Sequence, residues 1–339
     1  MSVSENIISL PLLASREEDA ASQSIPKTLR NAAARLVDSL KINSVCEKTR
    51  RGRRLVIKQR NGYSEPLGEL ANIYFRMAGI PIRFWVRTKE WQQWEVNCFN
   101  MLNGDRFHAR ALGTNSVSAD KLPGKNLWDH LTDGTLTRKM IEAAGHELRR
   151  AHQFRSDQFR GLWSHGDAGT NNVIYDHKTS RARLIDFEIV HEKSLPEKSR
   201  HADDLLVFLL DVIAVAPNPK WLSLVLAFLN AYGDASVISA LRNQLALPKG
   251  MAWIWWGVRT SFASPAKVKR RLKKIRSVIA DLEHYRAFVA RRARQTRRAS
   301  INCHTIRPGI PKTNSRTRAI KERAKAASPG IPSRLPMTT

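Results

Sequence analysis

Apolar residues form strand-like runs near the start of the chain and follow helical spacing over much of the rest. Two strand-like runs flank Arg50-Arg51-Gly52, and the second, Leu55–Lys58, ends on a lysine. A glycine between two such runs predicts a β-hairpin. Helical spacing of apolar residues predicts helices over 27–41, 67–78 and 88–102. The third of these begins with a threonine suited to a helix N-cap and carries two tryptophans.

The second half of the chain has a strand-rich segment followed by helices. A helix is predicted over 136–153, and the segment Trp163–Glu188 has the pattern strand, loop, strand, turn and strand. From Arg200 onward the pattern is helical, and a long basic amphipathic helix begins at Pro265. A small strand-containing half and a larger, mainly helical half predict an α+β fold with two lobes.

Composition adds boundaries to this picture. We expect a flexible N-terminus over 1–25, an N-lobe over 26–120, a C-lobe over 121–299 that ends in the basic helix, and a disordered basic tail over 300–339. No apolar run reaches the ~20 residues of a membrane-spanning helix, and the first residues make a poor signal peptide. Three widely separated cysteines fit reduced thiols. These features predict a cytoplasmic protein.

Charge is distributed unevenly along the chain. The formal net charge is +27, and the segment from Pro265 to the end holds 21 Lys and Arg against 3 Asp and Glu. Such an asymmetry favours a polyanionic partner, which is a nucleic acid, an anionic membrane surface or a phosphorylated saccharide. A solvated basic tail that only aids solubility is equally compatible with it, so both interpretations remain open.

The segment Trp163–Glu188 carries the residues most suited to chemistry. Asp167 and Asn172 are five residues apart across a glycine-containing loop, and Asp186 follows an apolar run. If the intervening strands pair, Asn172 and Asp186 lie at the same end of a hairpin. A carboxylate and an amide oxygen there could bind a hard cation such as Mg²⁺, which leaves Asp167 free to orient a hydroxyl. Plain turn formation by these residues is the alternative.

The order and spacing of these residues resemble the catalytic core of the protein-kinase-like fold. The sequence has His165-Gly166-Asp167, then Asn172, then Asp186-Phe187-Glu188. The resemblance implies that Asp167 faces the acceptor hydroxyl and that Asn172 and Asp186 bind Mg²⁺.

The same resemblance implies a lysine on an upstream strand and a glutamate on a helix, both serving ATP. Lys58 and Glu95 are the candidates, and the alternatives are an edge-strand lysine and a solvated helix residue. Leu122 and Gly124, in the sequence KLPG, are expected to form the hinge that meets adenine through backbone bonds. Asp204 is expected to brace the catalytic loop.

Departures from the protein-kinase pattern narrow the resemblance. Gly166 replaces the arginine before the catalytic aspartate, Glu188 replaces the glycine of the metal motif, and no GxGxxG loop is present. The gap from Lys58 to Glu95 is long. In these respects the chain is similar to lipopolysaccharide core kinases, the Kdo and heptose kinases, and to other small-molecule kinases.

The resemblance implies a kinase that uses ATP and Mg²⁺ to phosphorylate a hydroxyl of a saccharide or lipid-linked acceptor, at or near the inner membrane surface. A protein Ser/Thr kinase is the second interpretation. The third is a decayed kinase-like protein that binds nucleic acid or an anionic surface, because the glycine-rich loop is missing and the C-terminal region is basic.

Overall fold

The computed structural model describes residues 43–260 and 263–304, with side chains as far as residue 284. The helix predicted over 27–41, the N-terminus over 1–25 and the tail beyond 304 lie outside the described residues. The last helix, α10 (Pro265–His304), continues past the start of the tail predicted at residue 300. The chain divides into two compact units after Tyr285, and the elements that position the candidate site lie in the first.

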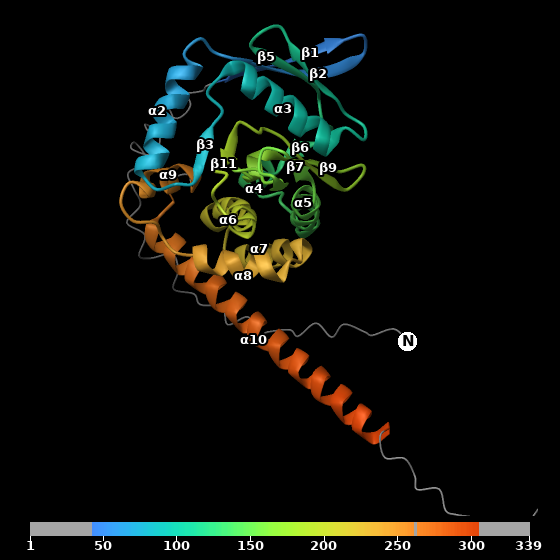
Figure 1. The fold of residues 1–339 in the computed structure, drawn as a ribbon. Coiled ribbons are helices and arrows are strands. Elements are labelled where there is room, and N and C mark those ends of the chain that lie inside the picture. The colour runs from blue at the N-terminus through green and yellow to red at the C-terminus, as the bar shows by residue number, and fades with distance from the viewer. Residues whose placement is uncertain (1–42, 261–262, 305–339) are drawn as a thin grey trace, which may run out of the picture. The chain divides into compact units, whose positions relative to one another are not determined.

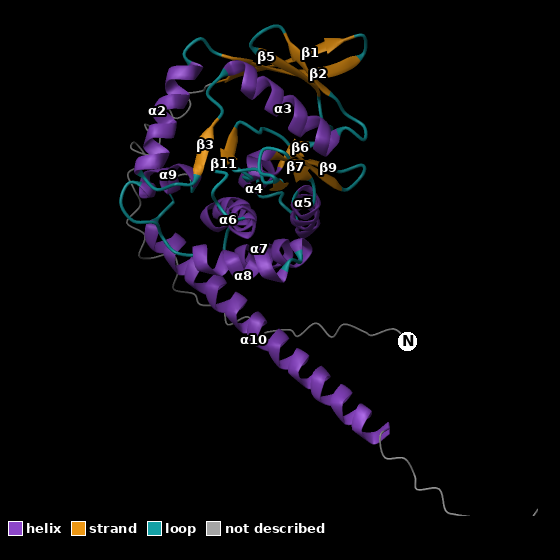
Figure 2. Ribbon diagram, in the orientation of Figure 1, coloured by secondary structure: helices purple, strands orange, loops and turns teal. Residues whose placement is uncertain are grey.

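Four strands form an antiparallel sheet in the order β1-β2-β5-β4. Figure 2 labels β1, β2 and β5 among them. They are β1 (Asn43–Arg50), β2 (Arg53–Arg60), β4 (Ala109–Leu112) and β5 (Ser116–Asp120). Arg51 and Gly52 connect β1 to β2 with φ values of 50° and 75°. Two successive positive φ angles are typical of a two-residue hairpin turn. The predicted hairpin is therefore confirmed.

Helix α3 (Thr88–Asn103) packs against this sheet and matches the predicted helix over 88–102 closely (Figure 1). Its buried face includes Trp91, Glu95, Cys98 and Phe99, which recur at helical spacing. Glu95 is the one buried carboxylate in this set, although buried carboxylates are normally paired. Its partner lies on β2, as described below.

A helix and a strand inserted after β2 connect the two halves of the chain. They are α2 (Ser64–Met77) and β3 (Ile82–Phe84), and their partners later in the chain are β11 (Ile189–His191) and α9 (Ala252–Arg259). β3 pairs antiparallel with β11. Phe75 of α2 stacks on Phe84, and its ring centroid lies 5.0 Å from that of Trp255 in α9. Helix α2 begins three residues before the predicted helix over 67–78.

The larger half contains short strands surrounded by helices (Figure 1). A second antiparallel sheet has the order β10-β9-β6. Its strands are β6 (Lys125–Asn126), β9 (Val173–Asp176) and β10 (Arg181–Leu184), and a small hairpin pairs β7 (Arg155–Ser156) with β8 (Gly161–Leu162). The helices are α4 (Leu127–Thr132), α5 (Arg138–Ala151), α6 (Glu197–Val215), α7 (Lys220–Tyr232) and α8 (Ala235–Gln244).

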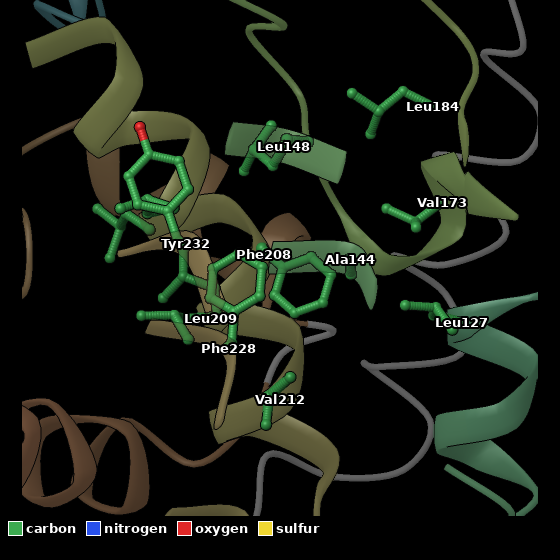
Figure 3. Packing of buried hydrophobic residues seen from close by; sticks show 14 of the residues in the cluster. Leu127, Ala144, Leu148, Val173, Leu184, Phe208, Leu209, Val212, Phe228 and Tyr232 are labelled. Atoms are coloured by element: carbon green, nitrogen blue, oxygen red, sulfur yellow. The ribbon is translucent and has the colours of Figure 1, made fainter. Parts of the chain in front are cut away.

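The core of this half forms where α5, α6 and α7 meet (Figure 3). The rings of Phe208 on α6 and Phe228 on α7 stack with centroids 4.1 Å apart. Gly145 lets α5 approach α7, because a Cβ at that position would lie 2.7 Å from the carbonyl oxygen of Phe228. Most of α6 is buried, including the whole stretch from Asp204 to Ala214. This helix is therefore a rigid support for the polar residues that it carries.

The observed elements confirm the predicted fold class, with a strand-containing N-terminal half and a larger helical half. Among the residues that the structure describes, none of the helices has the length and apolarity needed to cross a bilayer.

Candidate active site

A cleft of about 470 Å³ opens between the first sheet and the start of the larger half. Its lining includes Val56 and Lys58 of β2 and Val117 and Ala119 of β5. One residue lies between the members of each pair, so alternation along a strand places both members on the same face of the sheet. Predicted site residues that also line this cleft are Lys58, Glu95, Leu122, Gly124 and Asp186.

Lys58 lies at the centre of a cluster of carboxylates. Its Nζ ion-pairs with Asp186 and lies 3.5 Å from Glu95 Oε1 and 3.7 Å from Glu188 Oε2. The lysine side chain is 12% exposed. Burial alone would lower the pKa of Lys58, but the charges of Asp186, Glu188 and Glu95 together raise it. The lysine is therefore a fixed cation, and the expected pairing of Lys58 with Glu95 is present.

Glu95 contacts both the lysine and the segment that carries Asp186. Besides its ion pair with Lys58, its Oε2 accepts a hydrogen bond from the backbone N–H of Phe187, with an N···O distance of 3.1 Å. Burial raises the pKa of Glu95, and the charge of Lys58 opposes that rise. Glu95 thus fixes the position of Lys58 relative to the residue that follows Asp186.

The hairpin β9–β10 brings Asn172 and Asp186 together, as the sequence predicted. Val173 pairs with Leu184, so the residues that flank this pair, Asn172 and Ile185, lie opposite each other. The backbone N–H of Ile185 donates to the carbonyl oxygen of Asn172 at 3.0 Å. Asp186 follows directly and has a φ of 65°, a backbone conformation that is uncommon for aspartate. This conformation marks the point where the chain leaves the strand.

Asp167 lies on the other side of Asn172. The Asn172 Nδ2 donates to the backbone oxygen of Asp167 at 2.8 Å and lies 3.4 Å from its carboxylate. Because the amide nitrogen of Asn172 faces Asp167, its amide oxygen points away from Asp167 and is available as a ligand. Burial raises the pKa of Asp167, while Arg259 and His165 oppose that rise. Asp167 and Asn172 are adjacent to the cleft rather than among its lining residues.

Asp204 of α6 holds the start of this loop. Its carboxylate accepts hydrogen bonds from the backbone N–H groups of His165 and Gly166, each at 2.8 Å, and its side chain is fully buried. The imidazole Nε2 of His165 lies 3.0 Å from the carbonyl oxygen of Ile185. The expected brace by Asp204 is present, and His165 links the loop to the strand that leads to Asp186.

The predicted hinge lies at the rim of the cleft. Leu122 is buried, and Gly124 has a φ of 108°. A Cβ at position 124 would lie 1.9 Å from the carbonyl oxygen of Tyr175 in β9, so only glycine fits there. The close approach ties the hinge to the hairpin that carries Asn172.

The structure brings into the site Glu188, whose role the sequence left open, and two residues that sequence reasoning missed, Asp211 and Arg259. Glu188 contacts Lys58 and accepts a hydrogen bond from Asn43 of β1, and burial raises its pKa to about 7. Asp211 of α6 accepts hydrogen bonds from the backbone N–H and hydroxyl of Thr170. Arg259 of α9 lies next to Asp167. The sequence marks Asp211, which is seven residues after Asp204 and therefore on the same helix face.

The donor set fits a hard cation only in part. Within the described ranges, no group of three or more His, Cys, Asp or Glu side chains is arranged to hold a metal ion. The amide oxygen of Asn172 and the carboxylate of Asp186 offer two oxygen ligands. Mg²⁺ commonly takes one or two protein ligands and completes its shell with water and phosphate oxygens. The residues present therefore suit a magnesium ion that arrives with a nucleotide.

Comparison with known proteins finds similarity only at the level of structure. No protein-family model matches the chain, and no curated protein matches its sequence. An ethanolamine kinase of Plasmodium vivax is 9% identical over 70% of this chain and 79% of its own, with a TM-score of 0.40. An amicoumacin kinase in complex with AMP-PNP and Ca²⁺ is 15% identical over 75% and 95%, with a TM-score of 0.34.

An aminoglycoside-3′-phosphotransferase of type VIII is 14% identical over 69% of this chain and 98% of its own, with a TM-score of 0.30. TM-scores below 0.5 do not support an assignment of function, which therefore rests on the residues of this chain. Those residues occur in the order and places that the resemblance to the protein-kinase-like fold implies: the lysine with its glutamate, the loop aspartate, and the asparagine beside the metal-motif aspartate.

Proposed function

We propose that this protein is a phosphotransferase that moves the γ-phosphoryl group of ATP to a hydroxyl group. One observation carries the proposal. Lys58 is held between Glu95 and Asp186 inside a cleft that also contains the hinge residues Leu122 and Gly124. A fixed cation beside a metal-binding carboxylate is suited to a polyphosphate, which needs charge neutralisation and alignment more than covalent chemistry.

Each residue then has a defined task. Lys58 contacts the α- and β-phosphates, and Glu95 holds it in place. Asn172 and Asp186 would hold Mg²⁺, which neutralises charge on the β- and γ-phosphates. Asp167 accepts a hydrogen bond from the acceptor hydroxyl and takes its proton as the hydroxyl oxygen bonds to the γ-phosphorus. The bond from that phosphorus to the bridging oxygen breaks, and ADP leaves.

The acceptor class is the finer part of the proposal. The resemblance to lipopolysaccharide core kinases favours a saccharide or lipid-linked hydroxyl, reached in the cytoplasm at the inner membrane surface. The resemblance to other small-molecule kinases favours hydroxyl-bearing small molecules more broadly. The basic region that begins at Pro265 would assist binding at that membrane surface by contacting anionic lipid headgroups.

A second candidate is a decayed kinase-like protein that binds an anionic surface or a nucleic acid. The turn between β1 and β2 favours it, because two residues, Arg51 and Gly52, replace a glycine-rich loop. A short turn offers fewer backbone N–H groups to phosphates than a longer loop does.

Thermal stability with ATP separates the two candidates. ATP with Mg²⁺ should raise the Tm of the wild-type protein, and Asp186→Ala should remove the magnesium-dependent part of that rise. Asp157→Ala, which changes an exposed carboxylate, is the matched control. Absence of any response in the wild-type protein would reject the phosphotransferase.

Turnover tests the assigned role of Asp167. A panel of saccharides, amino alcohols and peptides with labelled ATP should identify an acceptor. Asp167→Asn should then lower kcat by about 10²–10⁴-fold with little change in nucleotide binding, because the lost group acts on the acceptor proton. Unchanged turnover in this variant would remove Asp167 from the mechanism.

A further inference from the structure

Arg259 reaches the catalytic loop from a helix more than 90 residues further along the chain. It lies at the end of α9, and its side chain is 7% exposed. Its Nη2 donates a hydrogen bond to the carbonyl oxygen of Gly166 at 3.0 Å and lies 3.8 Å from Asp167 Oδ1. We propose that Arg259 is a positioning residue that holds Asp167 in its acceptor-facing orientation, an inference that rests on the proposed function.

The guanidinium group of Arg259 also connects the loop to two other elements. Its Nη1 lies 3.7 Å from Asp203 Oδ2 on α6. The same Asp203 oxygen lies 3.2 Å from His191 Nε2 on β11, and His191 Nδ1 lies 2.9 Å from the hydroxyl oxygen of Ser164. A polar network thus runs from Ser164, just before the loop, to Gly166 and Asp167 within it. Arg259 closes that network.

Position 166 itself cannot supply this cation. Gly166 has a φ of 89°, and a Cβ there would lie 2.7 Å from the carbonyl oxygen of Ile189 and 2.9 Å from the Cα of Val190. Any side chain would therefore collide with the backbone of β11 and adopt an unfavourable φ. Position 166 therefore cannot carry a cation next to Asp167, and the guanidinium of Arg259 lies 3.8 Å from that carboxylate.

The surroundings of Arg259 suit orientation better than ligand binding. Two carboxylates, Asp167 and Asp203, and one carbonyl oxygen already face its terminal nitrogens, so little positive charge remains for an anionic acceptor. The guanidinium also lies over the ring of Trp255. A planar group that makes several directed contacts fixes its partners more firmly than a flexible ammonium does.

Loss of Arg259 should therefore move the loop and leave the nucleotide cleft in place. Without the guanidinium, the carbonyl of Gly166 loses its partner, and Asp167 and Asp203 face each other with no cation between them. The residues assigned to ATP, Lys58 and Glu95, lie on β2 and α3 and do not contact Arg259. We expect kcat to fall while KM for ATP stays the same.

The experiment uses the full chain with the variants Arg259→Gln and Arg259→Lys. Arg242→Gln is the matched control, since Arg242 also pairs with a carboxylate of a neighbouring helix, Glu283, away from the loop. The first readout is hydrogen exchange of ligand-free protein in peptides that cover residues 165–172. Arg259→Gln should accelerate exchange there about 10-fold, Arg259→Lys less, and the control not at all.

The second readout is steady-state ATP hydrolysis with Mg-ATP alone, in which water replaces the acceptor. Arg259→Gln should lower kcat about 100-fold with KM for ATP within a factor of two, and Arg259→Lys should restore part of kcat. A purely structural residue would not produce that split or that rescue.

The two readouts separate failure of this inference from failure of the proposed function. Wild-type exchange in both Arg259 variants would overturn the inference whether or not the protein hydrolyses ATP. If Arg259→Gln accelerates exchange but the wild-type protein neither binds nor hydrolyses ATP, Arg259 remains the residue that orders the loop. The kinase function is then rejected. If Arg259→Gln does not fold, Arg259→Lys alone decides by the same two measurements.

Discussion

At the residue scale, contact with the backbone of Tyr175 decides which residue fits at position 124 in the predicted hinge. Gly124 and Gly134 both have positive φ angles, of 108° and 74°. They differ in their surroundings, because a Cβ at Gly124 would meet the backbone of Tyr175, whereas nothing lies within 4 Å of the corresponding point at Gly134. Substitutions at these two glycines therefore distinguish the free-energy cost of a positive φ from the additional cost of a steric collision.

We predict that Gly134→Ala destabilises the protein by about 1–2 kcal/mol, the cost of a left-handed residue with a side chain. Gly124→Ala should lose about 1–3 kcal/mol more, because the hinge or β9 must shift to relieve the collision. Urea denaturation of both variants measures the difference. Equal losses would mean that the collision is relieved without cost. Nucleotide binding should weaken in Gly124→Ala alone.

Helix α6 organises the catalytic loop at the scale of elements. Asp204 and Asp211 are seven residues apart, so they lie on one face of the helix two turns apart. Asp204 accepts hydrogen bonds from the backbone N–H groups of His165 and Gly166, and Asp211 accepts them from the backbone N–H and the hydroxyl of Thr170. The loop thus rests on two carboxylates of a buried helix at both of its ends.

Removing the first of these carboxylates should be costly. Asp204→Ala leaves two buried backbone N–H groups without an acceptor and takes the partner from His152, whose Nε2 lies 3.0 Å from Asp204. We predict a loss of about 3–5 kcal/mol in the free energy of unfolding, measured by chemical denaturation.

Asp281→Ala, which changes an exposed residue of α10, serves as the control and should change stability by less than about 0.5 kcal/mol. A loss below about 1 kcal/mol in Asp204→Ala would contradict the brace.

Buried histidines link the stability of the whole molecule to pH. His152 and His201 stack with ring centroids 3.9 Å apart in the interior. Burial lowers the pKa of both, and that of His201 falls to about 3, with His152 contributing. The unfolded chain takes up a proton at each site below a pH of about 6.5, whereas folded His201 stays neutral until about pH 3. Their contribution to stability is therefore complete above pH 6.5 and declines towards pH 3.

Two carboxylates act in the opposite direction. Burial raises the pKa of Asp211 and of Glu188 to about 7, so both retain protons in the folded state at pH values where the unfolded chain has lost them. Their contribution is complete below the ordinary carboxyl pKa and is lost as the pH rises through about 7. The pH dependence of the free energy of unfolding is therefore a sum of opposing contributions. The contribution of one histidine is best measured as the difference between the wild-type protein and a variant that lacks it.

We predict that His201→Gln flattens the low-pH side of the stability curve. The wild-type free energy of unfolding minus that of the variant should rise by up to about 1.4 kcal/mol for each pH unit between pH 4 and 6.5. Glutamine can still donate to the carbonyl oxygen of Trp163, which His201 contacts at 2.9 Å. Denaturation series for both proteins at matched pH provide the test. Parallel curves would show that His201 does not contribute.

Local sequence determined much of the fold and part of the site. Turn residues predicted the β1–β2 hairpin, and helical spacing predicted α3 within one residue, because both depend on neighbours in the chain. The proximity of Asn172 and Asp186 could be predicted for the same reason, because the two residues lie at the open end of one hairpin, where Asn172 is opposite the residue that precedes Asp186. Lys58 and Glu95 were predicted from their positions before that hairpin, in the order that the resemblance to the protein-kinase-like fold implies.

Tertiary structure alone decided which distant groups complete the site. The sequence cannot show that Arg259 lies beside Asp167, that Asn43 bonds to Glu188, or that β3 pairs with β11. Each of these contacts joins segments that are separated by many residues and carry no shared periodicity. They form because packing of the buried helices fixes where each segment lies. The sequence by itself therefore determined the elements and the polar motif, and the packed core decided which charges surround that motif.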